Sequence, residues 1–310
     1  MGYLFLEYNS QNIQDGYFAQ LQRQIGIFSV SRIFRCEYLH SDIKDLTVTQ
    51  LDDFQSREAI DTFLENMNQI YKLPSSGRVP YRPKKIQLIS LSLRELIKLK
   101  VSSYFSREDI IISLTIPYRI IEKKIFINQL PRTIANFLVN SSKSSKQKFI
   151  VLHIRRGVNI EHVVPGEKSQ RVLNDEYFLN AAKKIMHDYQ LPNDTLVIIL
   201  TDAPSEKITY KPLIKDKEVW ENEFIESKRS SGIEIEGHKF ASFENSFGSN
   251  LQIIRGGNLQ SCVELMASAD HFVMSRSSMS YVGALLNTKG KVYYPPDFWH
   301  KPLKKWVKIS

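Results

Sequence analysis

The sequence predicts an α/β fold built on parallel sheets, and two observations lead to this prediction. Of the 310 residues, 42% are hydrophobic and 24% are charged, as is typical of a globular protein. In the second half of the chain, short apolar runs of strand length alternate with segments whose apolar residues recur at helical spacing. This alternation is typical of parallel strands joined by crossover helices, and a chain of this length is expected to form two domains.

The first half of the chain contains fewer apolar runs, and turn-forming residues separate them. The expected strands are residues 3–8, 36–40 and 85–90, and the expected helices are residues 15–34, 56–71 and 120–139. Asp52, Asp53 and Ser56 offer N-caps for the second of these helices, and Pro131 interrupts the third.

A polar segment rich in serine and lysine, residues 141–148, is the expected boundary between domains at residues 1–140 and 149–310. The second domain carries the regular alternation. Its expected strands are residues 149–153, 196–200, 251–254 and 271–274, and its expected helices are residues 176–189, 258–268 and 279–287.

Two adjacent arginines end the first strand of the second domain. The apolar run 149–152 leads directly into His153, and Arg155, Arg156 and Gly157 follow. Ligands of open α/β sheets bind at the carboxyl ends of the strands, and the planar guanidinium matches phosphate oxygens bidentately. These residues therefore predict a phosphate site, with a strand end carrying solvated arginines as the alternative.

A serine-rich turn lies between the expected strand 271–274 and the helix that follows it. Ser275, Ser277 and Ser278 place hydroxyl and backbone N–H donors at a helix N-terminus, which is an anion site. Helix capping without a ligand is the alternative. Asp202 directly follows the strand 196–200, where it contacts a ligand or holds a turn.

Near the start of the chain, Gly16 and Gln20 lie between the first strand and the first helix. Taken in order, this segment, the His-Ile-Arg-Arg run and the serine turn resemble three motifs of the GDP-fucose-dependent fucosyltransferases. The run resembles their His-x-Arg-Arg-x-Asp signature, with Val158 in the acidic position. Because the chain is short, the bacterial α1,2-fucosyltransferases are the most similar branch.

The resemblance implies a GT-B-like arrangement of two Rossmann-like domains with parallel sheets. Residues 1–140 would bind the acceptor and place a glycine loop near the donor, and residues 149–310 would bind the nucleotide sugar. The implied reaction is inverting transfer of fucose from GDP-fucose to a glycan hydroxyl, with no cofactor. The alternatives are a related glycosyltransferase with a different nucleotide sugar and a non-catalytic relative that binds a nucleotide or sugar.

The resemblance also assigns roles to individual residues. Arg155 and Arg156 would face the diphosphate, and His153 would orient the site or contact the nucleotide. The expected donor-binding residues are Gly16, Gln20, Asp202, Ser275, Ser277 and Ser278. No Asp-x-Asp motif is present and the histidines lack metal-ligand spacing, so we expect no bound metal and a metal-independent reaction.

Net charge and targeting signals bear on partners and location. The chain carries a net charge of +9, but it has no paired-cysteine zinc spacing and no RNA-binding aromatic signature, so nucleic acid is not expected. Cys36 and Cys262 lie in apolar segments, which favours buried thiols and a reducing compartment. No signal peptide or membrane span is visible, which indicates a cytoplasmic protein.

The basic tail at residues 299–308 interleaves Trp299 and Trp306 with lysines. Such a composition suits peripheral contact with the anionic inner surface of a membrane. The alternative, which we favour slightly, is that the tryptophans dock on the fold.

The acidic position of the signature generates a testable prediction. If Glu161 has taken over the role of the missing carboxylate, Glu161→Gln should cripple GDP-fucose turnover and Val158→Asp should do little or harm. If the interaction is lost, Val158→Asp should instead raise turnover. We expect the first result, because the arginines and the serine turn are retained. Turnover that changes by less than about threefold in both variants, under 1 kcal/mol, would place this segment outside the chemistry.

Overall fold

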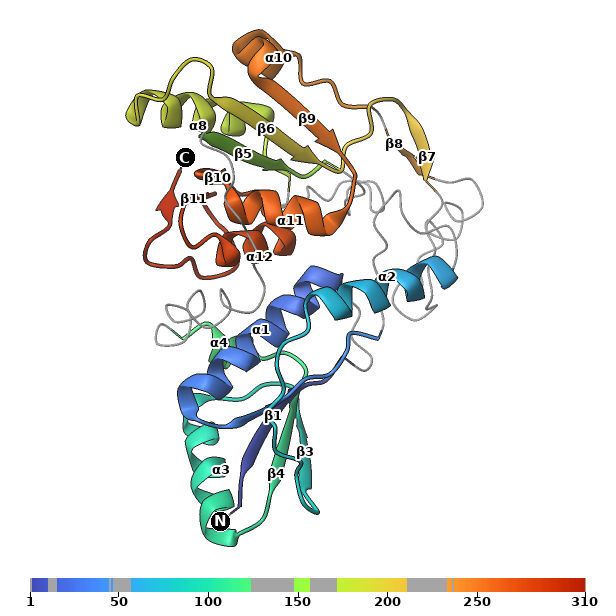
Figure 1. Cartoon of the computed structure of the whole chain (residues 1–310), viewed down its shortest axis with the longest axis vertical. Coiled ribbons are helices and arrows are strands. Elements are labelled where there is room, and N and C mark those ends of the chain that lie inside the picture. Colours follow the sequence, from blue (N-terminus) through green and yellow to red (C-terminus); the bar gives the residue numbers. More distant parts are fainter. Residues whose placement is uncertain are drawn as a thin grey trace. The chain divides into compact units, whose positions relative to one another are not determined.

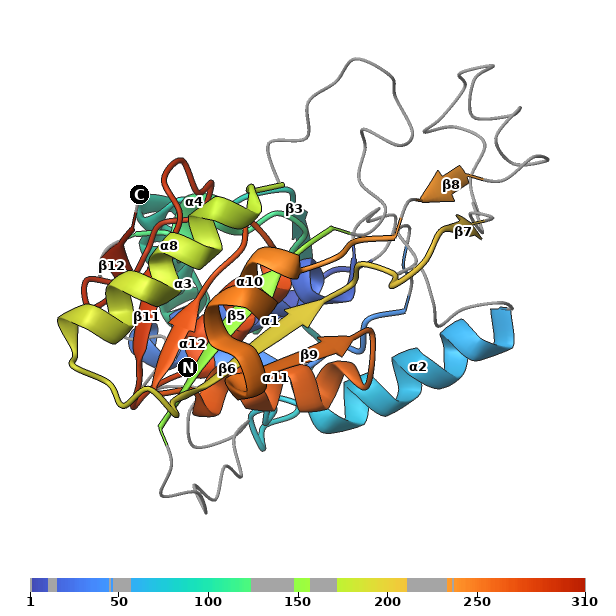
Figure 2. The ribbon, with the colours of Figure 1, turned by 90° about the horizontal axis from the view of Figure 1, so that it is seen from above.

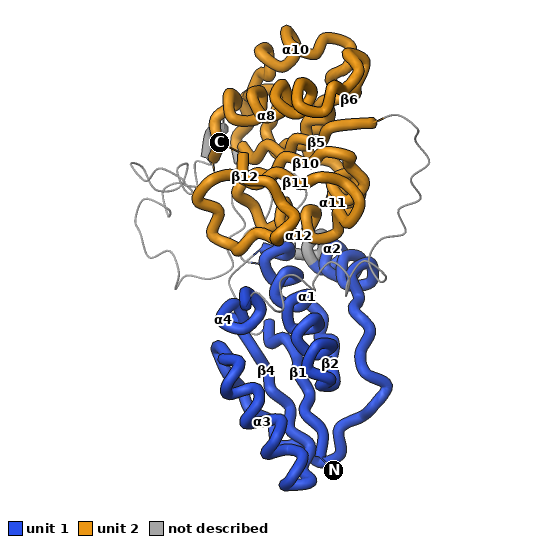
Figure 3. The backbone as a smooth tube through the Cα atoms, turned by 90° about the vertical axis from the view of Figure 1, so that its left-hand side faces the viewer, with its two compact units in different colours: residues 1–47, 61–139 blue, residues 48–60, 140–310 orange. Residues whose placement is uncertain are grey.

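The computed structural model describes residues 2–10, 16–44, 46, 57–123, 148–156, 172–210, 233–235 and 237–309 (Figure 1). The chain forms two compact units, residues 1–47 with 61–139 and residues 48–60 with 140–310 (Figure 3). Each unit contains an all-parallel sheet with helices packed on it, so the predicted α/β class with two Rossmann-like units is confirmed. The polar segment expected at the domain boundary lies outside the described residues, apart from Lys148.

The first unit has a four-stranded sheet in the order β2-β1-β4-β3. Its strands are β1 (Leu4–Tyr8), β2 (Glu37–Leu39), β3 (Lys84–Leu88) and β4 (Ile110–Leu114). The central strands β1 and β4 are almost entirely buried, since helices cover a parallel sheet and its inner strands must be apolar on both faces. The edge strand β3 begins with two exposed lysines.

The helices of this unit are α1 (Tyr17–Phe34), α2 (Arg57–Ile70), α3 (Leu93–Ser106) and α4 (Tyr118–Ile121). The boundary between the units, at residues 60 and 61, falls within α2. Helix α1 packs on β1 and β2 and is buried along most of its length. Helix α3 begins with a capping box, in which the Ser92 side chain accepts the Glu95 N–H and the Glu95 carboxylate accepts the Ser92 N–H.

The second unit has a six-stranded parallel sheet in the order β12-β11-β10-β5-β6-β9. Its strands are β5 (Phe149–Ile154), β6 (Leu196–Thr201), β9 (Leu251–Arg255), β10 (His271–Val273), β11 (Lys291–Tyr294) and β12 (Val307–Lys308). Phe149 pairs with Leu196 and Ile154 with Thr201, so β5 and β6 end level with each other. A separate antiparallel pair consists of β7 (Ile208–Tyr210) and β8 (Ile233–Ile235).

Helices cover both faces of the six-stranded sheet. Helices α8 (Asp175–Asp188) and α10 (Ala241–Phe247) lie on one face, and α11 (Leu259–Ser268) and α12 (Ser278–Leu286) lie on the other (Figures 1 and 2). A 3₁₀ turn, η2 (Gly248–Asn250), follows α10. The core under α8 and α10 includes the fully buried rings of Phe178, Phe240 and Phe243. On the other face α12 approaches α11 so closely that a Cβ at Gly283 would lie 2.8 Å from the Cβ of Met266.

The strand order contains a reversal at β5. From β5 the chain proceeds to β6 and β9 on one side, and it then returns to β10, β11 and β12 on the other side. Connections therefore leave the neighbouring strands β5 and β10 in opposite directions. In open α/β sheets, such a topological switch point is where ligands bind, beyond the carboxyl ends of the two strands.

The expected strands and helices are present in the described residues, with ends that shift by a few residues. The expected helix at residues 120–139 is the exception, since α4 ends at Ile121 and residues 124–139 lie outside the described residues. Among the described residues, the elements that the sequence did not predict are α3, α10, η2, β4, β7, β8, β11 and β12. The two cysteines are free thiols, and Cys262 is buried.

The C-terminal segment docks on the second unit. Residues of β12 pair with β11, and the Trp306 ring, which is 6% exposed, lies edge-on to Tyr281 of α12 at 5.5 Å between centroids. Trp299 is 41% exposed. Docking on the fold therefore accounts for one of the two tail tryptophans, and membrane contact stays a prediction. No helix among the described residues has the length and apolar character that crossing a bilayer requires.

Asn287 generates a stability prediction for the second unit. This residue is 0% exposed, its Nδ2 donates to the carbonyls of Met266 and Ala269 at 2.9 Å, and its Oδ1 accepts the Gly290 N–H at 2.8 Å. Asn287→Ala would leave these buried groups unpaired. We expect it to lower the free energy of unfolding by roughly 2–4 kcal/mol in urea titrations.

The exposed cap of α3 provides the control for this measurement. Ser92→Ala should cost about 1 kcal/mol, because water can replace part of a cap at an exposed helix end. Equal losses from the two variants would contradict the structural role that we assign to Asn287.

Candidate functional site

The ring of His153 joins the carboxyl end of β5 to the serine turn. His153 is 7% exposed, and its Nδ1 lies 2.5 Å from Ser280 Oγ and 3.2 Å from Ser275 Oγ. Ser280 Oγ also accepts the Ser275 backbone N–H at 3.1 Å, so its own hydrogen can be donated to the histidine. Two motifs that lie more than a hundred residues apart in the sequence therefore meet at the switch point.

His153 is held as a neutral ring. Burial lowers its pKa to about 4; the negative charge of Asp202 opposes this shift, and the positive charge of Arg155 adds to it. At neutral pH the imidazole therefore carries no charge that could balance a phosphate. Its contacts with Ser275 and Ser280 fit the orienting role predicted for it.

Of the two helices that follow β5 and β10, α12 has the N-terminus that better suits an anion. Ser277 is the N-cap, its side chain accepts the Met279 N–H at 3.2 Å, and its own N–H donates to Ser275 O at 2.9 Å. The first turn of α12 contains no acidic residue, whereas the first turn of α8 contains Asp175 and Glu176. Negative side chains already occupy the positive end of α8, so an incoming anion is favoured at α12. Ser278, the first residue of α12, is half-buried.

Arg156 lies in a network of fixed contacts. Its backbone N–H donates to Asp202 Oδ1 at 2.6 Å. Its side chain is 12% exposed; Nη2 donates to Asp175 Oδ1 at 2.5 Å and Nη1 donates to the Arg155 carbonyl at 3.0 Å. These two contacts use two of the five N–H donors of an arginine, so the fork can still donate to a ligand.

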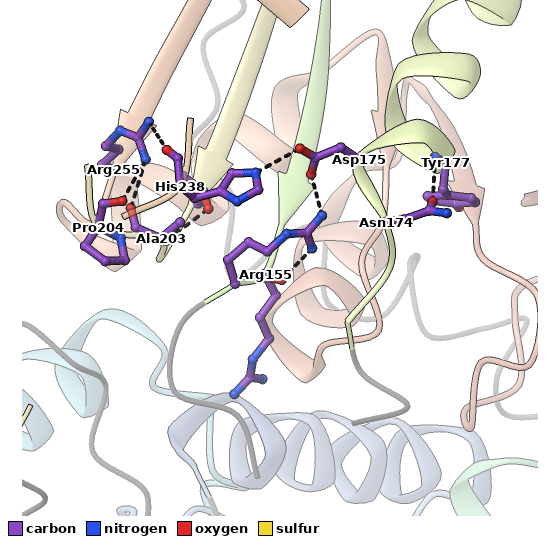
Figure 4. Close-up of polar contacts among 10 residues, drawn as sticks. Arg155, Asn174, Asp175, Tyr177, Ala203, Pro204, His238 and Arg255 are labelled. Carbon is purple, nitrogen blue, oxygen red and sulfur yellow. Dashed lines mark hydrogen bonds and ion pairs between the residues drawn. The ribbon is translucent and has the colours of Figure 1, made fainter. Parts of the chain in front are cut away.

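The side chain of Arg155 takes a different direction. Figure 4 shows it pointing away from the Asp175 carboxylate. It lies near enough to His153 for its charge to lower the pKa of that ring. The adjacent arginines thus present their guanidinium groups in separate directions from the end of β5.

Asp202 has a local contact that the sequence analysis left open as an alternative. At the end of β6 its carboxylate accepts the Arg156 N–H and so holds the turn that leaves β5. The neighbouring Arg255 ties the same edge together, because its guanidinium donates to the carbonyls of Ala203, Pro204 and His238 (Figure 4). A donor contact for Asp202 stays a prediction.

Several residues at this edge were not predicted. The clearest is the pair that Asp175 forms with His238, at 2.8 Å between Oδ2 and Nε2. Arg276 donates to Pro296 O at 2.9 Å, and its charge acts on Tyr177, whose pKa is raised by burial and lowered by this arginine. The Tyr177 hydroxyl is buried without a hydrogen-bond partner among the described residues. The N-cap Asn174 and two acidic residues after it were a visible helix-start signal, but no sequence signal marks His238.

Gly16 and Gln20 belong to the first unit. Gly16 is the N-cap of α1 with φ −70°, and a Cβ built there would meet nothing within 4 Å. The space beside this backbone is therefore open. The Gln20 side chain is fully buried, and its Oε1 accepts the Tyr8 hydroxyl at 3.2 Å. This contact assigns Gln20 an internal role, and donor binding by either residue stays a prediction.

The acidic position of the signature cannot be placed, since Gly157, Val158 and Glu161 lie outside the described residues. Within the part of the chain that the structure describes, no three His, Cys, Asp or Glu side chains cluster closely enough to hold a metal ion. Metal independence of the reaction stays a prediction for an assay.

Comparisons with known proteins give structural likenesses of low identity. No family model matches the chain, and no curated protein matches it. POFUT1 in complex with GDP has a TM-score of 0.42 at 9% identity, over 94% of this chain and 98% of that one. The E. coli heptosyltransferase WaaC with ADP has a TM-score of 0.38 at 9% identity, over 99% and 92%. The E. coli ADP-heptose LPS heptosyltransferase II has a TM-score of 0.36 at 10% identity, over 100% and 90%.

The buried histidines generate a prediction about pH. The pKa values of His153 and His271 are lowered to about 4, in each case chiefly by burial, from an ordinary value of 6.5. Between these limits the unfolded chain binds more protons than the folded chain, so the free energy of unfolding falls as the pH drops from about 6.5 towards 4. For His153 the full loss is on the order of 3 kcal/mol.

Urea unfolding of the second unit between pH 7 and pH 5 measures this dependence. His153→Gln and His271→Gln should each make the slope shallower, because each removes one proton-binding group from the unfolded chain. If the free energy of unfolding of both variants depends on pH as steeply as that of the wild type, the two rings have the same pKa in the folded and the unfolded chain.

Proposed function

We propose that this chain is an inverting glycosyltransferase that transfers fucose from GDP-fucose to a glycan hydroxyl. One observation carries the proposal: His153 contacts Ser275 and Ser280, so the His-Ile-Arg-Arg run and the serine turn lie together at the switch point. Each of the two segments resembles a donor motif by itself, and their contact supports a common role. A chance resemblance of unrelated segments would not require them to meet.

The electrostatics of this edge suit a nucleoside diphosphate. When the sugar leaves, the diphosphate gains negative charge, and fixed donors must stabilise this charge if no metal takes part. The N-terminus of α12 offers N–H groups without a competing acidic residue, and two guanidinium groups extend from the end of β5. We assign the diphosphate to Arg155, Arg156 and the start of α12.

The other predicted residues take supporting roles in this proposal. His153, which is neutral, orients Ser275 and Ser280 and leaves the stabilising charge to the arginines. Ser277 and Ser278 belong to the N-terminal turn of α12 that receives a phosphate.

A second candidate is a glycosyltransferase that uses a different nucleotide sugar. Val158 stands where the fucosyltransferase signature has an aspartate, and a change in a donor motif favours a change in the donor. A non-catalytic binding relative is the third candidate, because the same substitution would then mark the loss of activity.

A donor screen separates these candidates. Nucleotide sugars should be compared by thermal shift and by hydrolysis without acceptor, with and without EDTA. A ligand present at a hundredfold excess over its dissociation constant should stabilise the protein by about 2.7 kcal/mol. Turnover of GDP-fucose that survives EDTA supports the proposal, turnover of another donor alone supports the second candidate, and binding without turnover supports the third. Activity that EDTA abolishes and Mn²⁺ restores would refute metal independence.

Arg156 tests the site itself. Arg156→Ala should lower transfer by on the order of 10²–10³, by analogy with the loss of one preorganised donor. Arg156→Lys should rescue poorly, because a point charge cannot replace the planar fork. Arg94→Ala on the exposed side of α3 is the matched control and should leave transfer unchanged. Full activity of Arg156→Ala with native melting would remove Arg156 from the site.

A further inference from the structure

Three segments of the second unit converge on the guanidinium of Arg156. Arg156 follows β5, Asp175 lies in the first turn of α8, and His238 precedes α10. The Asp175 carboxylate binds Arg156 through Oδ1 at 2.5 Å and His238 through Oδ2 at 2.8 Å. Both oxygens are thus engaged, and the carboxylate is held between two side chains (Figure 4).

His238 is anchored independently of Arg156. Its backbone N–H donates to Pro204 O at 2.9 Å, and its carbonyl accepts from Arg255 Nη2 at 2.9 Å. Its ring lies edge-on to Phe240 at 4.6 Å between centroids, and Phe240 belongs to the buried core of the unit. A continuous series of contacts therefore runs from the core through His238 and Asp175 to Arg156.

The charge of Asp175 does not by itself explain its place here. A carboxylate beside an anion-binding arginine opposes the binding of a second anion, so Asp175 does not increase the attraction for a diphosphate. What it provides is direction. A free arginine side chain has about 2 kcal/mol of rotamer entropy, and a fork that is already oriented loses less of it when it binds.

We propose that Asp175 and His238 are positioning residues that hold the Arg156 guanidinium in the orientation in which it meets the donor diphosphate. This inference rests on the proposed function. It assigns a role in the reaction to two residues that no donor motif contains.

Two measurements test the proposal, and they separate its failure from failure of the proposed function. The first needs no ligand: the Arg156 Nε–H resonance should be sharp in the wild-type protein and broadened in Asp175→Ala, because the released side chain samples several rotamers. The second is the dissociation constant of GDP by calorimetry. We expect Asp175→Ala to weaken GDP binding at least tenfold, and Asp175→Asn, which keeps an acceptor oxygen, to stay within about threefold of the wild type.

The variants of His238 test the outer link of the network. His238→Gln retains an N–H donor for Asp175 and should bind GDP like the wild type. His238→Phe keeps a ring against Phe240 but has no donor, and it should weaken GDP binding about threefold or more.

A double-mutant cycle distinguishes positioning from a purely structural role. If Asp175 acts through Arg156, Asp175→Ala should have no further effect on GDP binding in an Arg156→Ala background. Additive losses, or an Asp175→Ala variant that binds GDP like the wild type, would overturn the inference. The Arg156 resonance could be sharp and depend on Asp175 in a protein that binds no nucleotide. This result would refute the proposed function, but it would still show that Asp175 fixes the orientation of Arg156.

Discussion

The pairing of β10 with β5 is the constraint on which the rest of the second unit depends. Val273 lies opposite Leu152, so the strand that precedes the serine turn ends beside the strand that precedes the two arginines. Because the chain returns across β5 to form β10, the connections after these strands leave in opposite directions. The His153 contacts with Ser275 and Ser280 depend on this register. A shift of one residue would turn the inward side chains of β10 to the opposite face.

At this edge of the sheet, the buried histidine is neutral and the arginine is paired with a carboxylate. The buried His153 is neutral and hydrogen-bonded to hydroxyls, which avoids the cost of an enclosed charge. The side chain of Arg156 is 12% exposed, and its guanidinium is paired with the Asp175 carboxylate. The hydroxyls of Ser275 and Ser280 therefore contact the end of β5, and the ion pair of Arg156 with Asp175 lies beside it. Such a division keeps this edge polar, and the charge of Arg156 is matched by that of Asp175.

Much of the second unit could be predicted from the sequence, because its strands are continuous apolar runs bounded by turn residues. The 149–153 strand and the helix after the serine turn were found in this way. In the first unit, α3 and β4 were missed although Ser92 and Glu95 form a capping-box pattern that marks a helix start. The contact between Asp175 and His238 could not be predicted from the sequence, because 63 residues separate them and only tertiary folding sets their distance. The internal contact of Gln20 with Tyr8 likewise depends on how a helix packs on a strand.

Gly283 influences the position of the serine turn from the buried side of α12. It lies in the middle of α12, where a side chain would collide with Met266 of α11. A helix moves as a rigid rod, so a larger residue at this position would tilt α12 and shift its first turn, with Ser277, relative to the end of β5. The contact between Gly283 and Met266 therefore helps to set the orientation of the serine turn. A single added methyl group at this contact would therefore move the serine turn while every residue at the strand ends stayed the same.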